Sequence, residues 1–175
     1  RGRSGRLRVS RAAVPLRTPD GETLALHEWP LAPGRDARAA VVLVHGIGEH
    51  AGRYAHVAAR LNDWGFSVRA ADHHGHGAST GPRGGLPSVM RLVDDLALVV
   101  DDTRRQYPGL PLVLLGHSLG GLVAASFVAR ALRPIDALVL SSPGLDPGLS
   151  LFQKGLIALL SRVAPTLRVG NGLDV

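Results

Sequence analysis

The sequence contains no cysteine in its 175 residues, so neither a disulfide framework nor a thiolate metal site can form within it. It also has no apolar run close to the roughly 18 residues that a membrane-spanning helix needs. The first 11 residues lack the apolar stretch of a secretory signal. From these absences we expect a cytoplasmic protein.

Two common nucleotide-binding motifs are absent as well. The chain has neither a G-x-G-x-x-G fingerprint nor a G-x-x-x-x-G-K-[ST] loop. These patterns place backbone N–H groups around phosphates at the start of a helix. Nucleotide binding therefore has no support, and we expect no cofactor.

Acidic residues are absent before Asp20, and this is where the excess positive charge lies. The formal net charge is +6 at pH 7, and six arginines precede Asp20, namely Arg1, Arg3, Arg6, Arg8, Arg11 and Arg17. The remaining chain carries 14 basic and 14 acidic residues and is neutral. We expect residues 1–17 to be a solvated terminus or an edge strand and nucleic acid not to be a partner; peripheral contact with anionic lipid is the alternative.

Apolar residues make up 45% of the chain and charged residues 19%, which is typical of one globular domain. The β-branched run at 39–44 indicates a strand covered on both faces. We expect further strands at 23–29 (at the sheet edge), 66–71, 112–115 and 137–140, and helices at 54–64, 88–107 (capped by Ser88) and 119–132. This alternation predicts a mostly parallel α/β sheet with helices on both faces.

Residues 116–120 read Gly-His-Ser-Leu-Gly between an expected strand and an expected helix. A G-x-S-x-G turn at this place is strained and exposes its serine, and the small residues Gly116 and Gly120 let it close. Ser118 is therefore the candidate nucleophile. A hydroxyl needs a base at neutral pH, but the neighbouring His117 is expected to point away from it.

All eight histidines lie at or before position 117. In the fold that uses this turn, the chain order is serine, then an acid, then histidine. We therefore expect the acid and the histidine beyond residue 175, and the 175 residues alone to be inactive. The alternative is a rearranged pair in which His45 or His50 approaches Ser118 in space.

A second candidate loop, His45-Gly46-Ile47-Gly48, follows the strand expected at 39–44. Its glycines would let the Ile47 N–H turn toward Ser118. Together with the N–H of Leu119 it would form an oxyanion hole, which suits acyl transfer because negative charge develops on the carbonyl oxygen. The simpler alternative is that the loop only closes a strand–helix connection.

A third loop holds His73, His74 and His76, and imidazole is a common zinc ligand. Yet the glycines at 75, 77 and 81 fit a sharp loop below a pocket, and no H-E-x-x-H pattern occurs. We therefore expect no metal.

Residues 23–146 resemble α/β-hydrolases of the monoacylglycerol lipase and lysophospholipase type, which are grouped with serine aminopeptidase-like hydrolases. The resemblance lies in residues 45–50 with Arg53 and Tyr54, and in 72–79, 107–111 and 116–121. It implies an α/β-hydrolase fold whose C-terminal strands and most of whose cap are missing from this chain. It also implies that Ser118 is the nucleophile and that Ile47 and Leu119 supply the oxyanion N–H groups.

The resemblance divides the chain into the basic segment 1–17, the N-terminal half of a hydrolase core at 18–146 and the start of a lid or cap at 147–175. The apolar stretch 149–163 would open a cap that shapes an acyl-chain tunnel, and a helix buried in the main core is the alternative. We expect a serine carboxylic-ester hydrolase for monoacylglycerol-like or lysophospholipid-like esters. The alternative is a catalytically incomplete module that binds a lipid or small acyl ligand.

Overall fold

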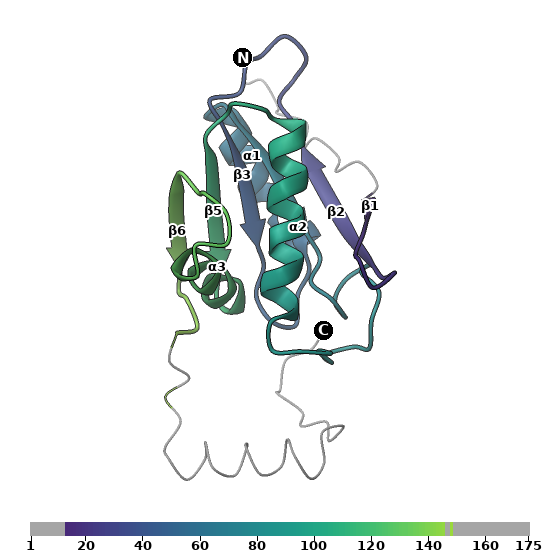
Figure 1. Cartoon of the computed structure of the whole chain (residues 1–175). Coiled ribbons are helices and arrows are strands. Elements are labelled where there is room, and N and C mark those ends of the chain that lie inside the picture. Colours follow the sequence, from purple (N-terminus) through teal and green to yellow (C-terminus); the bar gives the residue numbers. More distant parts are fainter. Residues whose placement is uncertain (1–12, 146–147, 149–175) are drawn as a thin grey trace, which may run out of the picture.

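The computed structural model describes residues 13–145 and 148, which form a six-stranded sheet with the order β1-β2-β4-β3-β5-β6 (Figure 1). The strands are β1 (Val14–Arg17), β2 (Thr23–Trp29), β3 (Ala39–Val44), β4 (Phe66–Ala71), β5 (Leu112–His117) and β6 (Ala137–Ser141). The helices are the 3₁₀ turn η1 (Ala51–Tyr54), α1 (Ala55–Asp63), α2 (Arg91–Gln106) and α3 (Leu119–Ala129). The segment 1–12 and the lid expected from 149 onward lie outside the described residues.

The sheet is mostly parallel, as the alternation of strands and helices predicts. Strand β3 pairs in parallel with β4 and β5, and β5 pairs in parallel with β6. Among the described strands only β2 runs in the opposite direction, and it pairs antiparallel with both β1 and β4. The carboxyl ends of the parallel strands therefore meet at one edge, where ligands collect in sheets of this kind.

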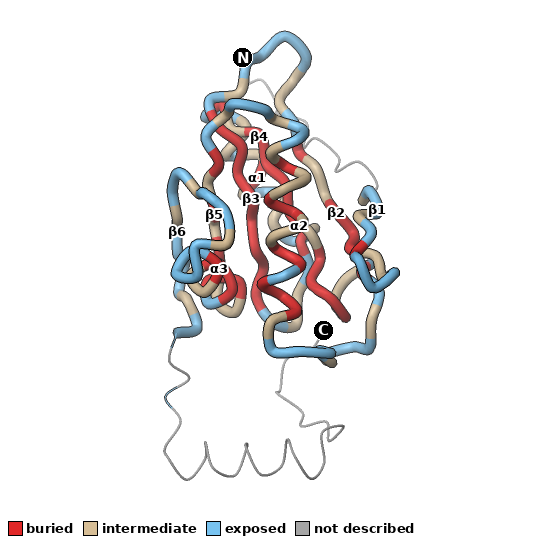
Figure 2. Tube along the Cα trace, in the orientation of Figure 1, coloured by how far each residue is buried: buried red, intermediate tan, exposed pale blue. Residues whose placement is uncertain are grey.

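Helices cover both faces of the sheet. Successive residues of β3 point to opposite sides, so the strand contacts both helical layers. Val42 and Val44 pack with α2 and α3, whereas Val41 and Leu43 pack on the side of α1. Figure 2 shows the buried central strands between these layers. The expectation of a doubly covered strand at 39–44 is confirmed.

Two local expectations are wrong. The strand Thr23–Trp29 is not at the edge, because β1 pairs with its outer side. Ser88 does not cap α2: the helix begins at Arg91, its N-cap is Met90, and Ser88 contributes only a carbonyl that accepts the Arg91 N–H at 3.2 Å. The loop between Asp72 and the helix is thus longer than the sequence pattern indicates.

Strand β6 lies at the other edge of the sheet. Among the described residues it pairs only with β5, and its Val139 and Leu140 are 46% and 37% exposed. Proteins normally cover or charge such apolar edges because they template aggregation.

In the part of the chain that the structure describes, no helix combines the length and the apolar character needed to cross a bilayer.

Phe127 offers a test of the core below α3. Its side chain is fully buried, whereas Leu122 on the same helix is 40% exposed. Because removing a buried ring leaves a cavity, Phe127→Ala is expected to lower the free energy of unfolding by about 3–5 kcal/mol. Leu122→Ala is the matched control and should cost less than about 1 kcal/mol. Urea denaturation measures both, and equal losses would contradict this packing.

Candidate functional site

The turn between β5 and α3 holds Ser118 in an unusual backbone conformation. Its φ is 51° and its ψ is −119°. Residues other than glycine rarely adopt this backbone conformation, because it costs conformational free energy. Four hydrogen bonds keep it there. The Ser118 N–H donates to Ser141 O at 3.0 Å, and Ser118 O accepts the N–H groups of Gly121 and Gly144, each at 3.0 Å, and of Leu122 at 3.2 Å. The end of β5, the end of β6 and the start of α3 thus meet at this residue.

The glycines around Ser118 are required by close backbone approach. A Cβ on Gly120 would lie 2.1 Å from the carbonyl oxygen of Val44, and a Cβ on Gly116 would lie 2.5 Å from that of Gly120. No rotation of a side chain can relieve such a contact, because the neighbours are backbone atoms. Helix α3 therefore packs directly against the ends of β3 and β5.

The loop after β3 lies beside Ser118. A Cβ on Gly46 would be 3.2 Å from the Ser118 Cβ, so the two residues are in contact. Ile47 follows with 57% of its surface exposed, and Gly48 has a φ of 68°. Neither the Ile47 N–H nor the Leu119 N–H donates to any of the described residues.

His45 begins this loop with a completely buried side chain. Its Nε2 accepts the His73 backbone N–H at 2.9 Å, so the proton sits on Nδ1 and is donated to Gly46 O at 2.7 Å. The His73 Nε2–H in turn donates to His45 O at 2.9 Å. This reciprocal pair joins the loop after β3 to the loop after β4.

Burial keeps both imidazoles neutral. It lowers the pKa of His45 to about 4 and the pKa of His73 to about 3, because a charged ring would lose its hydration. Both nitrogens of His45 are engaged, so the hypothesis that His45 serves as the base has no geometric support.

The other histidines of the expected site also have different contacts. His117 directs Nδ1 to Ser141 Oγ at 3.2 Å, and His50 is exposed before η1. All eight histidines are among the described residues, and none of these eight forms a hydrogen bond with Ser118.

Asp72 anchors the loop after β4, a role that the sequence pattern does not reveal. Its Oδ1 accepts the Ala51 N–H and its Oδ2 the Ala78 N–H, both at 2.8 Å. Burial alone would raise the pKa of Asp72. The hydrogen bonds from His27 and from these two N–H groups outweigh that effect and lower the pKa to about 2. A Cβ on Gly77 would lie 2.1 Å from its Oδ2, so the loop closes tightly on the carboxylate.

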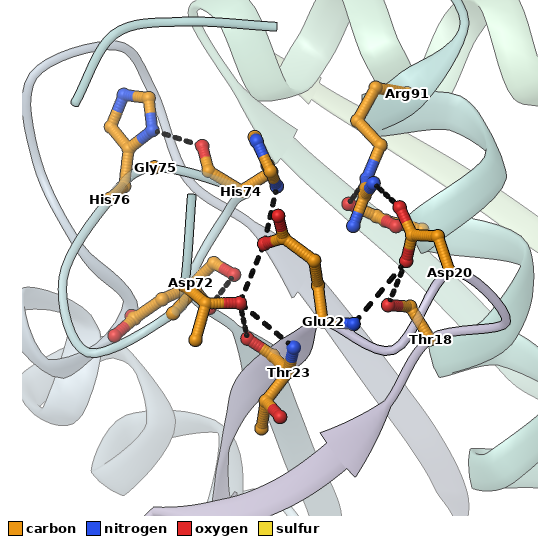
Figure 3. Close-up of polar contacts among 12 residues, drawn as sticks. Thr18, Asp20, Glu22, Thr23, Asp72, His74, Gly75, His76 and Arg91 are labelled. Atoms are coloured by element: carbon orange, nitrogen blue, oxygen red, sulfur yellow. Dashed lines mark hydrogen bonds and ion pairs between the residues drawn. The ribbon is translucent and has the colours of Figure 1, made fainter. Parts of the chain in front are cut away.

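The histidines of this loop do not converge on a common point. The His76 Nδ1 lies 3.0 Å from His74 O, and the His74 Nδ1 lies 3.4 Å from Glu22 Oε2, as Figure 3 shows. Within residues 13–145 and 148 there is no group of three or more histidine or acidic side chains that could hold a metal ion.

The same loop is tied to the turn between β1 and β2. Thr80 Oγ1 donates to Glu22 Oε2 at 2.7 Å and accepts the Thr23 N–H at 2.9 Å. On the other side of the turn, Arg91 bonds both Asp20 and, at 2.9 Å, Asp95 (Figure 3). These contacts fix the edge of the sheet that carries the candidate site.

Glu49 lies in the loop after β3, and Tyr54 is the last residue of η1. The sequence patterns assign neither a separate role. The Glu49 Oε1 accepts the Gly46 N–H and the Tyr54 O–H, each at 2.6 Å. The only sequence signal is that both residues stand in the stretch 45–54, close to His45 and Gly46.

Comparisons with known proteins identify similar chains. The family described as serine aminopeptidase, S33, matches residues 35–175. A monoacylglycerol lipase of Mycolicibacterium smegmatis is 40% identical over 141 residues, which cover 79% of this chain and 50% of the relative. The chain thus spans about half the length of the curated relatives it matches.

Solved structures agree with the architecture. The crystal structure of a Paleococcus ferrophilus monoacylglycerol lipase has a TM-score of 0.67 and 37% identity, covering 86% of this chain and 56% of that one. A soluble variant of the Saccharomyces cerevisiae monoglyceride lipase has a TM-score of 0.79 over 99% of this chain and 60% of that one, and its 22% identity bears on the fold alone. The described part has the sheet and helices of the α/β-hydrolase fold.

The two buried histidines, His45 and His73, should make the free energy of unfolding depend on pH. In the unfolded chain both would titrate near the ordinary pKa of about 6.5, whereas folding lowers the pKa of His45 to about 4 and that of His73 to about 3. The unfolded state therefore binds more protons below pH 6.5, and the free energy of unfolding falls as the pH falls. From pH 7 to 5 we expect a loss on the order of 1–2 kcal/mol per histidine in urea denaturation.

A variant pair isolates this effect. His73→Gln keeps a donor near Nε2 but cannot be protonated, so it should remove about half of the pH dependence attributed to the two rings. His56→Gln changes an exposed ring and should leave the dependence unchanged. An unaltered slope in His73→Gln would contradict the assignment.

Proposed function

Since the chain belongs to the serine aminopeptidase, S33, family, we propose that the protein is a serine hydrolase of the esterase and lipase type that acts through an acyl-enzyme on Ser118. The observation that carries this proposal is the backbone of Ser118, whose φ of 51° sits at a strand-to-helix turn. A strained, positive-φ serine at this place is what the nucleophile elbow of such enzymes requires.

In the proposed reaction the Ser118 Oγ attacks the ester carbonyl carbon and gives its proton to a base. The alcohol leaves with a proton, and water then releases the acyl group as a carboxylic acid. The Ile47 and Leu119 N–H groups would bind the oxyanion, which their lack of other partners among the described residues supports. Removing one such donor typically costs about 2.7–4 kcal/mol of transition-state stabilisation.

We propose that the base and its acid partner are residues beyond position 175. The contacts of three described histidines support this proposal: the rings of His45 and His73 are engaged with each other's backbone, and His117 is directed to Ser141. It also agrees with the chain order serine, acid, histidine that is typical of this elbow.

Monoacylglycerol-like or lysophospholipid-like esters are the proposed substrates. The support is the 37–40% identity to relatives named monoglyceride or monoacylglycerol lipase. A further relative, from Bacillus subtilis, is named phospholipase and is 35% identical. A lid over the acyl chain stays a prediction, because 149–175 lies outside the described residues.

The test uses the full protein that carries this chain. The wild type should form a covalent adduct with a fluorophosphonate at Ser118 and hydrolyse a glycerol monoester, and Ser118→Ala should lose both. Ser88→Ala, at an exposed serine whose side chain does not cap α2, is the control and should keep both. A full protein that binds the ester but neither reacts nor turns over would contradict the proposal and favour a binding module; turnover by these 175 residues alone would place the base within them.

A further inference from the structure

The Glu49 carboxylate joins the loop between β3 and η1 to η1 itself, in a contact of Gly46, Glu49 and Tyr54 that we call the Glu49 bridge. One carboxylate oxygen, Oε1, accepts both the Gly46 N–H and the Tyr54 O–H at 2.6 Å. The Glu49 side chain is only 16% exposed. Short hydrogen bonds to an ionised acceptor are about twice as strong as neutral ones, so the bridge holds the loop firmly.

The Glu49 bridge lies beside the candidate nucleophile. A Cβ on Gly46 would be 2.7 Å from Glu49 Oε1 and 3.2 Å from the Ser118 Cβ. Gly46 is therefore in contact with both the carboxylate and Ser118. The Tyr54 ring also lies 6.3 Å from the ring of His117, the residue before Ser118.

Tyr54 is a dependable donor in this bridge. Burial and the nearby Glu49 carboxylate raise the pKa of Tyr54 well above its usual value, because a phenolate there would be desolvated and repelled. The phenol therefore keeps its hydrogen at neutral pH. Arg53 Nε lies 4.0 Å from Glu49 Oε2 with its side chain 64% exposed, which makes it a weak, solvent-screened partner.

We propose that Glu49 is a positioning residue of the hydrolytic site: by accepting the Gly46 N–H it withholds this amide from the substrate and presents the next amide, Ile47 N–H, to the carbonyl oxygen. This inference rests on the proposed function of Ser118. Glycines at 46 and 48 leave the loop many backbone conformations, and a donor stabilises an oxyanion well only when it is already oriented. The bridge supplies that orientation.

The role depends on acceptor geometry and not on the negative charge. A carboxylate near a developing oxyanion repels it, so charge alone would slow the reaction. A glutamine at position 49 keeps an oxygen that can accept both hydrogen bonds. The proposal therefore separates Glu49→Gln, which preserves the bridge, from Glu49→Ala, which removes it.

The experiment compares ester hydrolysis by the full protein and its variants. Glu49→Ala should lower kcat by roughly 10- to 100-fold and change KM by less than about threefold, because the donor is needed in the transition state. Glu49→Gln should stay within about fivefold of the wild type, and Tyr54→Phe, which keeps the Gly46 bond, should fall between the two. Asp63→Ala removes an exposed carboxylate on α1 and is the control without effect.

Fluorophosphonate labelling of Ser118 should slow in parallel with kcat, and thermal unfolding shows whether each variant is folded. If Glu49→Ala fails to fold, the graded loss in Tyr54→Phe carries the test. A normal kcat in Glu49→Ala, a raised KM with unchanged kcat, or Glu49→Gln as slow as Glu49→Ala would each overturn the positioning role. Activity retained in Ser118→Ala would instead overturn the proposed function itself.

Discussion

Backbone-to-backbone contact at the start of α3 is the constraint on which the candidate site depends. The helix lies so close to β3 that any side chain on Gly120 would meet the Val44 carbonyl oxygen at 2.1 Å. This closeness forces the chain to turn within one residue between β5 and α3, and Ser118 takes the unfavourable φ of 51° as a result. Hydrogen bonds with Ser141 at the end of β6, with Gly144 in the turn after it, and with the first turn of α3 offset part of that cost.

Hydrogen bonds of buried polar groups join the loops around this turn. The reciprocal pair of His45 and His73 connects the loops after β3 and β4, while Asp72 binds N–H groups from η1 and from its own loop. In a dry environment such bonds are costly to break. The same burial that makes them strong keeps the two imidazoles neutral, so these histidines serve the architecture of the loops.

Two kinds of hydrogen-bond donor then surround Ser118. Some amides are occupied, such as Gly46 N–H by Glu49 Oε1 at 2.6 Å. Others, Ile47 and Leu119, have no partner among the described residues. The proposed oxyanion hole would need this division, because free donors have to be held in place by neighbours that are not free.

Periodicity and motif alone predicted much of this protein. The strand at 39–44 follows directly from its β-branched run, and the serine turn follows from glycines two residues to either side of Ser118, because these features depend on near neighbours in the chain. Other features could be known only from the tertiary structure, because they depend on residues that are far apart in the sequence. Strand β2 is interior because β1 pairs with it, and Asp72 anchors a loop through Ala51, which lies 21 residues earlier. Gly46, Glu49 and Tyr54 are close in sequence, and their contact is local. Its position beside Ser118 depends on the packing of β3, β5 and α3.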